Sequence, residues 1–466
     1  MARADLGELP AAVVSTDAAD LAPHLVGWRG AKHGSAIALL RPRDTGEVQE
    51  IVRWAGRHGV ALVPQGGNTG LVGGGIPEGG PNTGGRPSVV LSMQRMNRVL
   101  SVDRHGLSLL AEAGAILDTV HGAAEEAGCR FPLSLGSRGS ATVGGLVSTN
   151  AGGVQVLRHG PMRSLVLGLE AVLADGAVLN QVSALRKDNT GYDLKQLLIG
   201  AEGTLGIVTR VALRLAPALA VSTVAWAAVP TADAALLLLS RLRAGLGERI
   251  ESFELISKEA LDLVLEKLPG TRPPLPATSA FHVLIEAESP RDAVETLLAS
   301  SLGAGEATDA VLALSGAQAK EFWALRENIA VAERLEGVAV KNDVAVPVDR
   351  VAEFDRRARA LFGRLQAEAR PIVFGHLGDG NLHWNLRPPA GVDSGPWVET
   401  HGDGVRRALH DLVVEFHGSI SAEHGIGTLK AAELARLGDP GKLAAMRAVK
   451  AALDPAGLMN PGKLFV

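Results

Sequence analysis

Three glycine-rich stretches in the first 210 residues constrain the fold of this chain more than any other feature. They run from Pro64 to Gly74 (PQGGNTGLVGG), from Ser134 to Gly153 and from Gly200 to Thr209 (GAEGTLGIVT). Glycine permits a positive φ and lets backbone N–H groups approach a ligand closely, which suits a diphosphate. None of the three contains G-x-G-x-x-G, so the ordinary dinucleotide-binding fingerprint is absent. One such stretch alone would more often be a plain turn, but the three together predict one large anionic ligand.

The pattern between the glycine-rich stretches is mixed. Residues 35–74 predict a strand, a helix, a second strand and then a glycine-rich loop. Apolar residues recur at helical spacing from Val48 to Ala55, and Asp44 or Thr45 can cap that helix. From about Val221 the glycine-rich loops stop, and strands alternate with helices. This change predicts a separate α+β domain built on an antiparallel sheet.

Composition excludes several classes of protein. The chain has 466 residues, a formal charge of −4 and no long run of Lys or Arg, so a nucleic-acid partner is not expected. Cys129 is the only cysteine, which excludes an intrachain disulfide and a cysteine-based zinc site. We expect a cytoplasmic location. No secretory signal and no membrane-spanning segment is expected, because no window approaches the ~20 apolar residues that a membrane helix needs.

The stretch GHLGDGNLHWN, from Gly375 to Asn385, carries two histidines around an Asp-Gly turn signal. Short apolar runs flank this turn, so we expect a β-hairpin that brings His376 and His383 together. The motif SAEHG adds Glu423 and His424 from a later segment. Two histidines and one carboxylate leave open positions on a divalent ion, as in a catalytic site. Zinc suits this donor set, although the residue types also admit manganese, cobalt or iron(II).

Six ordered motifs give the chain a resemblance to a known family. PQGGNTGLVGG, TVGGLVSTNAGG and GAEGTLGIVT resemble the FAD-binding loops of the vanillyl-alcohol-oxidase (PCMH-type) flavoproteins. GHLGDGNLHWN, SAEHGIGTLK and LMNPGKLF resemble the C-terminal half of their D-2-hydroxyacid dehydrogenase branch. The resemblance runs from about Pro42 to Phe465. It implies an α+β chain with a PCMH-type FAD-binding domain of two α/β subdomains (1–217), an α+β substrate- and metal-binding domain (218–420) and a helical segment that returns to the FAD domain (421–466).

The resemblance implies FAD as the cofactor, held without a covalent bond. Family members with covalent FAD use a histidine or cysteine in these loops, whereas the matching loop here reads Gly67-Asn68-Thr69. The cofactor-binding residues would come from the three loops and from the C-terminus. They are Pro64, Gln65, Gly66, Gly67, Asn68, Thr69, Gly70, Leu71, Leu135, Gly136, Ser137, Thr142, Gly144, Gly145, Ser148, Thr149, Ala151, Gly152, Glu202, Gly206, Ile207 and Asn460.

The resemblance also implies an activity, the oxidation of a D-2-hydroxy acid to the 2-oxo acid with hydride transfer to flavin N5. His376, His383 and Glu423 would bind the metal. His424 would accept the hydroxyl proton, because a neutral imidazole has a suitable pKa and Glu423 is committed to the metal. The substrate contacts would come from Arg326, Lys341, Asn385 and His424.

The identity of the hydroxy acid is less constrained. Arg326 and Lys341 match family residues that hold the distal carboxylate of D-2-hydroxyglutarate, so this dicarboxylate is the first expectation. Ala330 departs from the family pattern, because it replaces a threonine whose hydrogen bond would contribute about 1–2 kcal/mol. D-lactate, glycolate and D-malate therefore stay open as substrates.

Some expectations concern partners. A catalytically idle flavin- or metal-binding subunit of a redox complex is the alternative from a different functional class. As an enzyme, the protein would pass electrons to an electron-transfer flavoprotein or a quinone, because the sequence has neither the cysteines for an iron–sulfur cluster nor a dinucleotide fingerprint. A homodimer is expected by resemblance.

Overall fold

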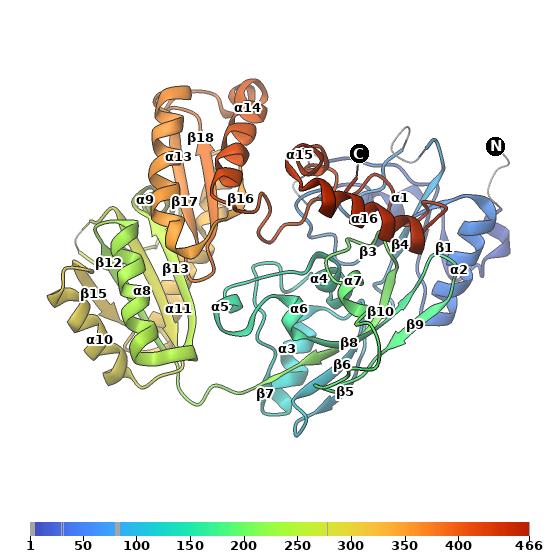
Figure 1. The fold of residues 1–466 in the computed structure, drawn as a ribbon, viewed down its shortest axis with the longest axis horizontal. Helices are drawn as coiled ribbons and strands as arrows, with labels where there is room; N and C mark the ends of the chain where they lie inside the picture. The colour runs from blue at the N-terminus through green and yellow to red at the C-terminus, as the bar shows by residue number, and fades with distance from the viewer. Residues whose placement is uncertain (1–4, 29, 31, 80–83, 277, 466) are drawn as a thin grey trace. The chain divides into compact units, whose positions relative to one another are not determined.

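The protein, described by a computed structural model over residues 5–28, 30, 32–79, 84–276 and 278–465, consists of two compact units. Unit 1 comprises Met1–Gly153, Gly160–Ala218 and Glu423–Val466, and unit 2 comprises Val154–His159 and Leu219–Ala422 (Figure 1). Each unit has its own sheet or sheets and its own apolar core. Within the described residues, no helix combines the length and the apolar character that crossing a membrane would require.

The first sheet of unit 1 is built from short apolar runs. β2 (Ala38–Leu40), β4 (Ser88–Ser92) and β3 (Ala61–Gln65) lie parallel in that order, and β1 (Val14–Ser15) pairs antiparallel with β2. Parallel neighbours need a crossover connection, and α2 (Thr45–His58) follows β2 and leads into β3. The predicted order of strand, helix, strand and loop is therefore confirmed.

The sequence explains why α2 begins and ends where it does. The Asp44 carboxylate accepts a hydrogen bond from the Glu47 N–H at 2.9 Å, and Gly59 ends the helix with a φ of 64°. The apolar stripe between Val48 and Ala55 is buried. Each aliphatic side chain fully buried in this way contributes roughly 1.5–3 kcal/mol. This packing fixes β3, whose C-terminal end leads into the first glycine-rich loop.

The second sheet of unit 1 is antiparallel, and a two-stranded ribbon lies outside it. Its strands, in spatial order, are β5 (Val99–Asp103), β6 (Ser108–Glu112), β10 (Ile207–Arg214), β8 (Val166–Val172) and β9 (Val178–Gln181). The ribbon pairs β7 (Cys129–Arg130) with β11 (Ala216–Pro217). The other helices of unit 1 are α1 (Ala18–Leu21), α3 (Leu117–Glu126), α4 (Val143–Thr149), α6 (Met162–Leu165), α7 (Lys195–Leu198), α15 (Ala431–Leu437) and α16 (Pro440–Leu453).

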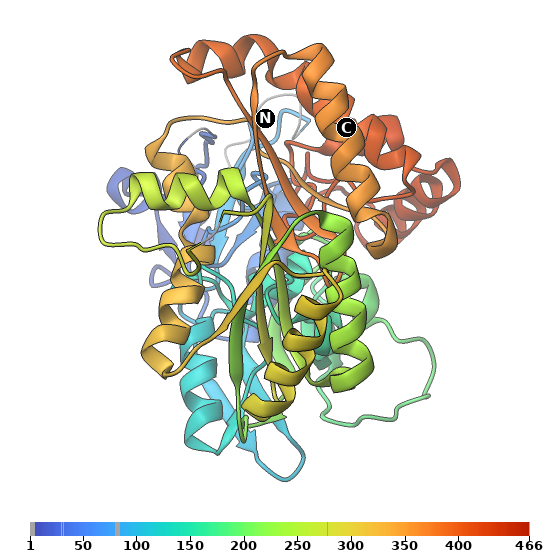
Figure 2. The same cartoon turned by 90° about the vertical axis from the view of Figure 1, so that its left-hand side faces the viewer.

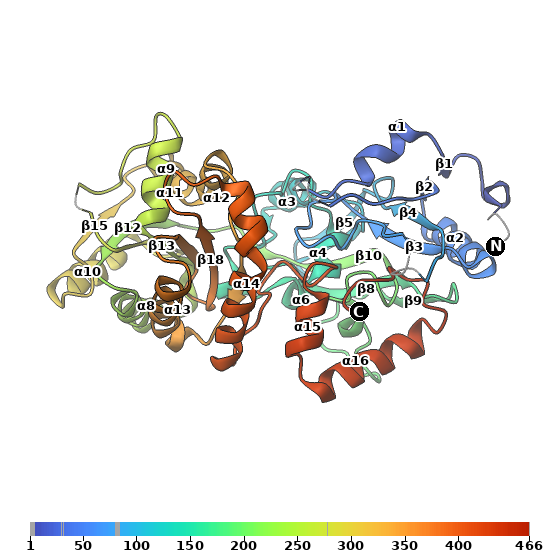
Figure 3. The same ribbon diagram turned by 90° about the horizontal axis from the view of Figure 1, so that it is seen from above.

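The end of the chain lies beside β3. The Leu62 N–H donates to the Leu458 carbonyl at 2.9 Å, and the Asn460 N–H donates to the Leu62 carbonyl at 2.8 Å. The buried Asp454 carboxylate fixes the preceding turn by accepting from the Leu458 and Met459 N–H groups. Figures 1 and 3 show α15 and α16, in red, which lead to this segment. Asn460 therefore stands next to the loop that follows β3.

Unit 2 is an antiparallel α+β structure, as predicted. Its sheet has the strand order β15 (Asp309–Leu312), β12 (Thr223–Val229), β14 (Phe281–Ala287), β13 (Ile250–Ser257), β17 (Arg370–His376), β18 (Asn381–Arg387) and β16 (Asp343–Ala345). Its helices are α5 (Val156–His159), α8 (Ala232–Leu246), α9 (Lys258–Lys267), α10 (Arg291–Gly303), α11 (Gly316–Glu327), α12 (Ile329–Leu335), α13 (Val351–Leu365) and α14 (Ser394–Glu415).

Helices cover both faces of this sheet. α9, α11 and α12 pack on one face, where Trp226, Ile256 and Phe374 belong to a common apolar core with Leu325 and Ile329. α8 and α10 lie on the opposite side of the sheet in Figure 2. The face covered by α11 and α12 is the one that carries the polar cluster described below.

Candidate active site

The first two predicted cofactor loops of unit 1 are in direct contact. A β-carbon added to Gly67 would lie 1.8 Å from the carbonyl oxygen of Ser140, and one added to Gly66 would lie 2.0 Å from Thr142 Oγ1. Both distances are far below a van der Waals contact, so only glycine allows the loops to meet here. The two loops therefore form one surface.

The third loop and the C-terminus join this surface. The Glu202 N–H donates to the Ser148 carbonyl at 2.7 Å, which links the third loop to the second. The Asn460 amide donates to the carbonyls of Gly74 (2.9 Å) and Glu202 (2.7 Å). Burial raises the pKa of Glu202 although its carboxylate accepts from the N–H groups of residues 426 and 427. The sequence-predicted loops thus converge with Asn460.

Two features of this surface fit an elongated polar ligand such as FAD. Thr142 Oγ1 and Asn460 Oδ1 are buried and have no hydrogen-bond partner among the described residues. Buried polar atoms are nearly always bonded, so each is an available contact for a ligand. At Gly70 an added β-carbon would meet none of the described residues within 4 Å. The loops are also rigidly held, since Asn68 donates to the Val26 carbonyl at 2.9 Å and Gln65 to the Gly75 carbonyl at 2.8 Å.

The predicted cofactor residues differ in their accessibility. Those that are buried can support the surface from behind or contact a ligand with a single edge, whereas the partly or fully exposed ones can line it. The buried ones are Gln65, Thr142, Gly144, Ala151, Glu202, Gly206, Ile207 and Asn460. The accessible ones are Pro64, Gly66, Gly67, Asn68, Thr69, Gly70, Leu71, Leu135, Gly136, Ser137, Gly145, Ser148, Thr149 and Gly152.

The predicted hairpin is present in unit 2. β17 and β18 pair with Phe374 opposite His383, and the Gly380 N–H closes the turn onto the His376 carbonyl at 3.1 Å. The ring centroids of His376 and His383 lie 6.2 Å apart. The hairpin therefore brings the two histidines close enough to share an ion.

The polar face of β18 is not open to solvent. Leu382, Trp384 and Leu386 are buried as the alternation predicts, but Asn385 and Arg387 on the other face are buried as well. Glu333 of α12 covers them: its carboxylate accepts from Asn385, and its carbonyl accepts from Arg387 at 3.1 Å. The alternation along β18 does not predict this burial, because α12 is remote in sequence.

Glu254 connects two predicted site residues. Strand pairing places it opposite His376, whose Nδ1 lies 2.6 Å from Glu254 Oε1, and Arg326 forms an ion pair with Oε2 at 2.8 Å. The guanidinium also stacks over the Phe374 ring, 4.8 Å from its centroid. Burial works to raise the pKa of Glu254, but His376 and Arg326 outweigh it, so the pKa is lowered. Sequence reasoning missed Glu254, and its only signal is a lone carboxylate in the apolar run SFELIS.

Asp343 is the second site residue that sequence reasoning missed. It pairs with His383 across β16 and β18, and its Oδ1 lies 3.8 Å from His383 Nδ1. The Asn381 amide donates to the same carboxylate oxygen at 2.9 Å. The buried Asp343 therefore faces the histidine cluster, and its only sequence signal is an acidic residue inside the strand pattern NDVAV.

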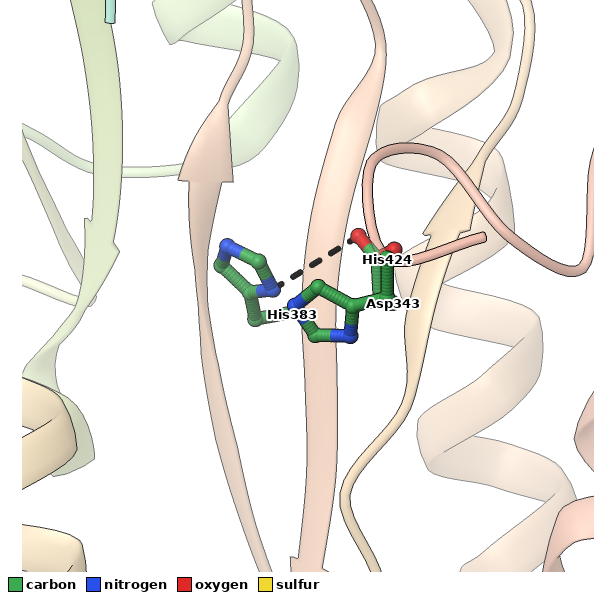
Figure 4. A group of neighbouring side chains, drawn as sticks. All are labelled: Asp343, His383 and His424. Carbon is green, nitrogen blue, oxygen red and sulfur yellow. Dashed lines mark ion pairs between the residues drawn. The ribbon is translucent and has the colours of Figure 1, made fainter. Parts of the chain in front are cut away.

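The motif SAEHG begins at the same sheet edge. The Ala422 N–H donates to the Asp343 carbonyl at 3.4 Å, so Glu423 and His424 are only one and two residues beyond a contact with β16. Two groups of side chains have ligand atoms within 4.8 Å of one another, and each could hold one metal ion. They are His376 with His383 and Glu423, which is the predicted set, and Asp343 with His383 and His424, which Figure 4 shows side by side.

These donor sets fit a divalent metal. Two imidazoles and one carboxylate are donors that zinc accepts, and a three-ligand set leaves positions for a substrate. Glu254 contacts Nδ1 of His376, so with Nε2 as the metal ligand it would orient the ring in the way carboxylates commonly orient metal-bound histidines.

The predicted substrate residues all have partners within the protein. Arg326 is paired with Glu254, and the Lys341 ammonium lies 3.2 Å from Glu333 Oε2. The Asn385 amide donates to both Glu333 oxygens at 3.0 Å and accepts from the Asn342 N–H at 2.9 Å. Arg326 and Asn385 are almost fully buried, whereas Lys341 is a quarter exposed.

Comparison with known proteins identifies two matching family models in this chain. The family model for the FAD binding domain matches residues 36–181 of unit 1. The model for FAD linked oxidases, C-terminal domain, matches residues 219–464, which is more than half of the chain. The solved structure of p-cresol methylhydroxylase with substrate bound is similar in fold, with a TM-score of 0.75 at 16% identity over 99% of this chain and 95% of that one.

Two curated relatives are similar over nearly the whole chain. Mitochondrial D-2-hydroxyglutarate dehydrogenase of Bos taurus is 41% identical over 462 residues, covering 97% of this chain and 81% of its own. D-2-hydroxyglutarate dehydrogenase of Xanthomonas citri pv. viticola is 37% identical over 461 residues, covering 98% and 95%. The resemblance seen in the six motifs is confirmed, as is the PCMH-type fold. The chain therefore belongs to the FAD-linked oxidase family of flavoenzymes, in the branch that contains these two relatives.

Proposed function

We propose that this protein is an FAD- and divalent-metal-dependent dehydrogenase that oxidises a D-2-hydroxy acid to the 2-oxo acid. The observation that carries the proposal is the group formed by His376, His383 and Glu423, whose ligand atoms lie within 4.8 Å of one another in a chain that also has an FAD-binding domain. The names of the relatives give the same class of substrate.

FAD and a divalent metal ion would supply the chemistry that side chains cannot. Bound FAD accepts a hydride, and a bound zinc ion lowers the pKa of a hydroxyl coordinated to it. Gly66, Gly67 and Gly70 would approach the cofactor with backbone groups. Asn460 would offer its Oδ1, which accepts no hydrogen bond from the part of the chain that the structure describes.

His424 is the residue we assign to proton transfer. Its neutral imidazole nitrogen takes the proton of the substrate hydroxyl as the Cα–H leaves as hydride, so the substrate loses two electrons and two hydrogens in one balanced oxidation. Asp343 supports this assignment, because its ligand oxygen lies within 4.8 Å of a His424 ring nitrogen and a carboxylate stabilises an imidazolium.

Two candidate substrates should be tested first. D-2-hydroxyglutarate is favoured by the relatives' names and by the cations Arg326 and Lys341. A monocarboxylate such as D-lactate is the second candidate. It is favoured by a specific observation: each cation already forms an ion pair with a buried glutamate, and Ala330 stands where a threonine was expected.

Anaerobic reduction of the bound flavin tests the proposal. We expect D-2-hydroxy acids, but not their L-enantiomers, to bleach the flavin absorbance, and we expect EDTA treatment to stop the bleaching until zinc is restored. A flavin that no D-2-hydroxy acid reduces would overturn the proposal, and bleaching unaffected by complete metal removal would overturn its metal part.

Three further proposals concern the electron acceptor, the location and the oligomeric state. We propose an electron-transfer flavoprotein or a quinone as electron acceptor, a cytoplasmic location and a homodimer. Reoxidation of the reduced protein by each acceptor, cell fractionation and light scattering would test the three points separately.

A further inference from the structure

Glu333 is a buried carboxylate that neither the FAD nor the metal chemistry uses. It lies on α12 with 1% of its surface exposed. Both of its oxygens accept from the Asn385 amide at 3.0 Å, and Oε2 lies 3.2 Å from the Lys341 ammonium. A carboxylate so deeply buried needs such partners, because an isolated charge in the interior is strongly disfavoured.

Sheet register places this glutamate beside the candidate metal ligands. Asn385 is two residues beyond His383 on β18, so both side chains lie on the same face of the sheet. Asp343 pairs with His383, and the next bridge along the strands joins Val340 to Leu386. Lys341 therefore lies opposite Asn385. The contacts of Glu333 thus lie on the same face of the sheet as the candidate metal ligands, two residues along β18 from His383.

The two cations predicted to hold a second substrate carboxylate are already paired within the protein. Glu333 neutralises Lys341, and Glu254 neutralises Arg326 at 2.8 Å. A second substrate carboxylate at Lys341 would meet the negative charge of the buried Glu333 at close range, where repulsion is stronger than in bulk water. Capture of Lys341 by that carboxylate would also leave Glu333 with its charge buried and less compensated. An uncharged side chain has neither problem, and a hydroxyl group could donate to Glu333.

We propose that Glu333 determines substrate specificity by excluding a second carboxylate, so that the preferred substrate is a D-2-hydroxy acid with an uncharged side chain. This inference rests on the proposed function, since it concerns the same oxidation at the same site.

The experiment compares kcat/KM for D-lactate, D-glycerate and D-2-hydroxyglutarate with a dye as electron acceptor. Wild-type protein should favour the better monocarboxylate over D-2-hydroxyglutarate by at least about tenfold. Glu333→Gln should raise kcat/KM for D-2-hydroxyglutarate about tenfold or more, mainly by lowering KM, and should change the value for D-lactate by less than about threefold.

A matched control is available on the preceding helix. Glu327→Gln removes the same charge from an exposed position outside the site and should leave the ratio of the two kcat/KM values unchanged. Glu333→Leu also removes the charge, at the cost of the two acceptors of the Asn385 amide, and it carries the same test if the Gln variant folds poorly.

The outcomes separate this inference from the proposed function. A wild-type preference for D-2-hydroxyglutarate, or a substrate ratio in both Glu333 variants equal to that of the Glu327→Gln control, would overturn the inference while the enzyme assignment stands. Failure of every D-2-hydroxy acid to reduce the wild-type flavin would overturn both.

Discussion

The cofactor loops of unit 1 and the polar cluster of unit 2 are built in opposite ways. The loops depend on the absence of side chains: Gly66 and Gly67 lie so close to the second loop that an added β-carbon would collide with it. The cluster depends on long polar side chains: strand register brings His376 to Glu254, and the packing of α11 on the sheet brings Arg326. Backbone surfaces of this kind suit a large cofactor, whereas side-chain clusters suit an ion and a small acid. The comparison predicts that the two functions can be lost separately.

The largest effect is expected in the polar cluster of unit 2, where one substitution should remove metal binding and leave FAD binding intact. His383→Ala removes the histidine that both candidate metal groups share. Turnover of D-2-hydroxy acids should fall at least about 1,000-fold, because the variant loses the ion that activates the hydroxyl. Flavin absorbance should remain, since the FAD loops are made by other residues.

The measurements are zinc content, flavin absorbance and steady-state rate on the same preparation. His417→Asn is a suitable control, because His417 is exposed at the end of α14 and asparagine tolerates its φ of 55°. A His383→Ala protein that retains near-normal turnover would contradict the metal assignment.

The second largest effect is expected in the cofactor loops of unit 1. Gly67→Ala would put a β-carbon 1.8 Å from the Ser140 carbonyl, and backbone cannot move aside as a flexible side chain can. Forcing the loops apart should destabilise the protein by about 1–3 kcal/mol or more and release FAD, while zinc stays bound.

Gly70→Ala is the control for steric strain, because its β-carbon would meet nothing within 4 Å in the protein itself. The melting temperature of the apoprotein should be unchanged by Gly70→Ala and lowered by Gly67→Ala. If Gly67→Ala protein binds FAD with normal affinity, the direct packing of the two loops has no role in cofactor binding.

The same difference explains which features of the fold and of the site could be predicted from the sequence. Glycine clusters, the capping Asp44 and the Asp379-Gly380 turn act within a few residues of where they stand, so the loops, α2 and the hairpin could be predicted. The partners of Arg326 and Asn385 could not be. Glu254 reaches His376 only through the pairing of β13 with β17, and Glu333 reaches Asn385 only through the docking of α12.

The sequence also gives no sign that one short segment belongs to the other unit. Residues 154–159 belong to unit 2 although the chain on both sides of them belongs to unit 1. Arg158 pairs with the buried Glu251 and with Glu288, two carboxylates more than ninety positions later in the chain. No local periodicity reports such a pairing, because charged residues in a short helical turn look like ordinary surface residues.

A smaller effect is expected at Glu254, which tests whether the cluster depends on its supporting carboxylate. Glu254→Gln leaves Arg326 and His376 without the buried negative charge that they share. Zinc affinity should fall about 10- to 100-fold, the usual effect of changing a group that orients a metal ligand. Competition with a chromogenic chelator would measure it.

Glu251→Gln provides a matched control on the same strand. Glu251 is also buried, and it forms ion pairs with Arg158 and His159 away from the metal groups. Both variants should lose stability, because each removes a buried negative charge that forms ion pairs. Equal zinc affinities in the two variants would show that Glu254 only stabilises the fold.

The smallest effect on activity is expected at His282, a buried histidine of unit 2 outside the polar cluster. Burial lowers the pKa of His282 to about 4, from an ordinary value of 6.5. Its Nδ1 accepts from the Trp226 indole at 3.2 Å, so the neutral ring is the form that the fold accommodates. The unfolded chain binds this proton more readily, so stability is fully present above about pH 6.5 and falls as the pH drops towards 4. The loss is at most about 3 kcal/mol.

Urea unfolding between pH 4 and 7 tests this expectation. His282→Asn keeps an acceptor for Trp226 and should flatten this part of the stability profile, whereas His105→Asn, at an exposed position, should not. Identical slopes in both variants would show that other groups cause the acid sensitivity.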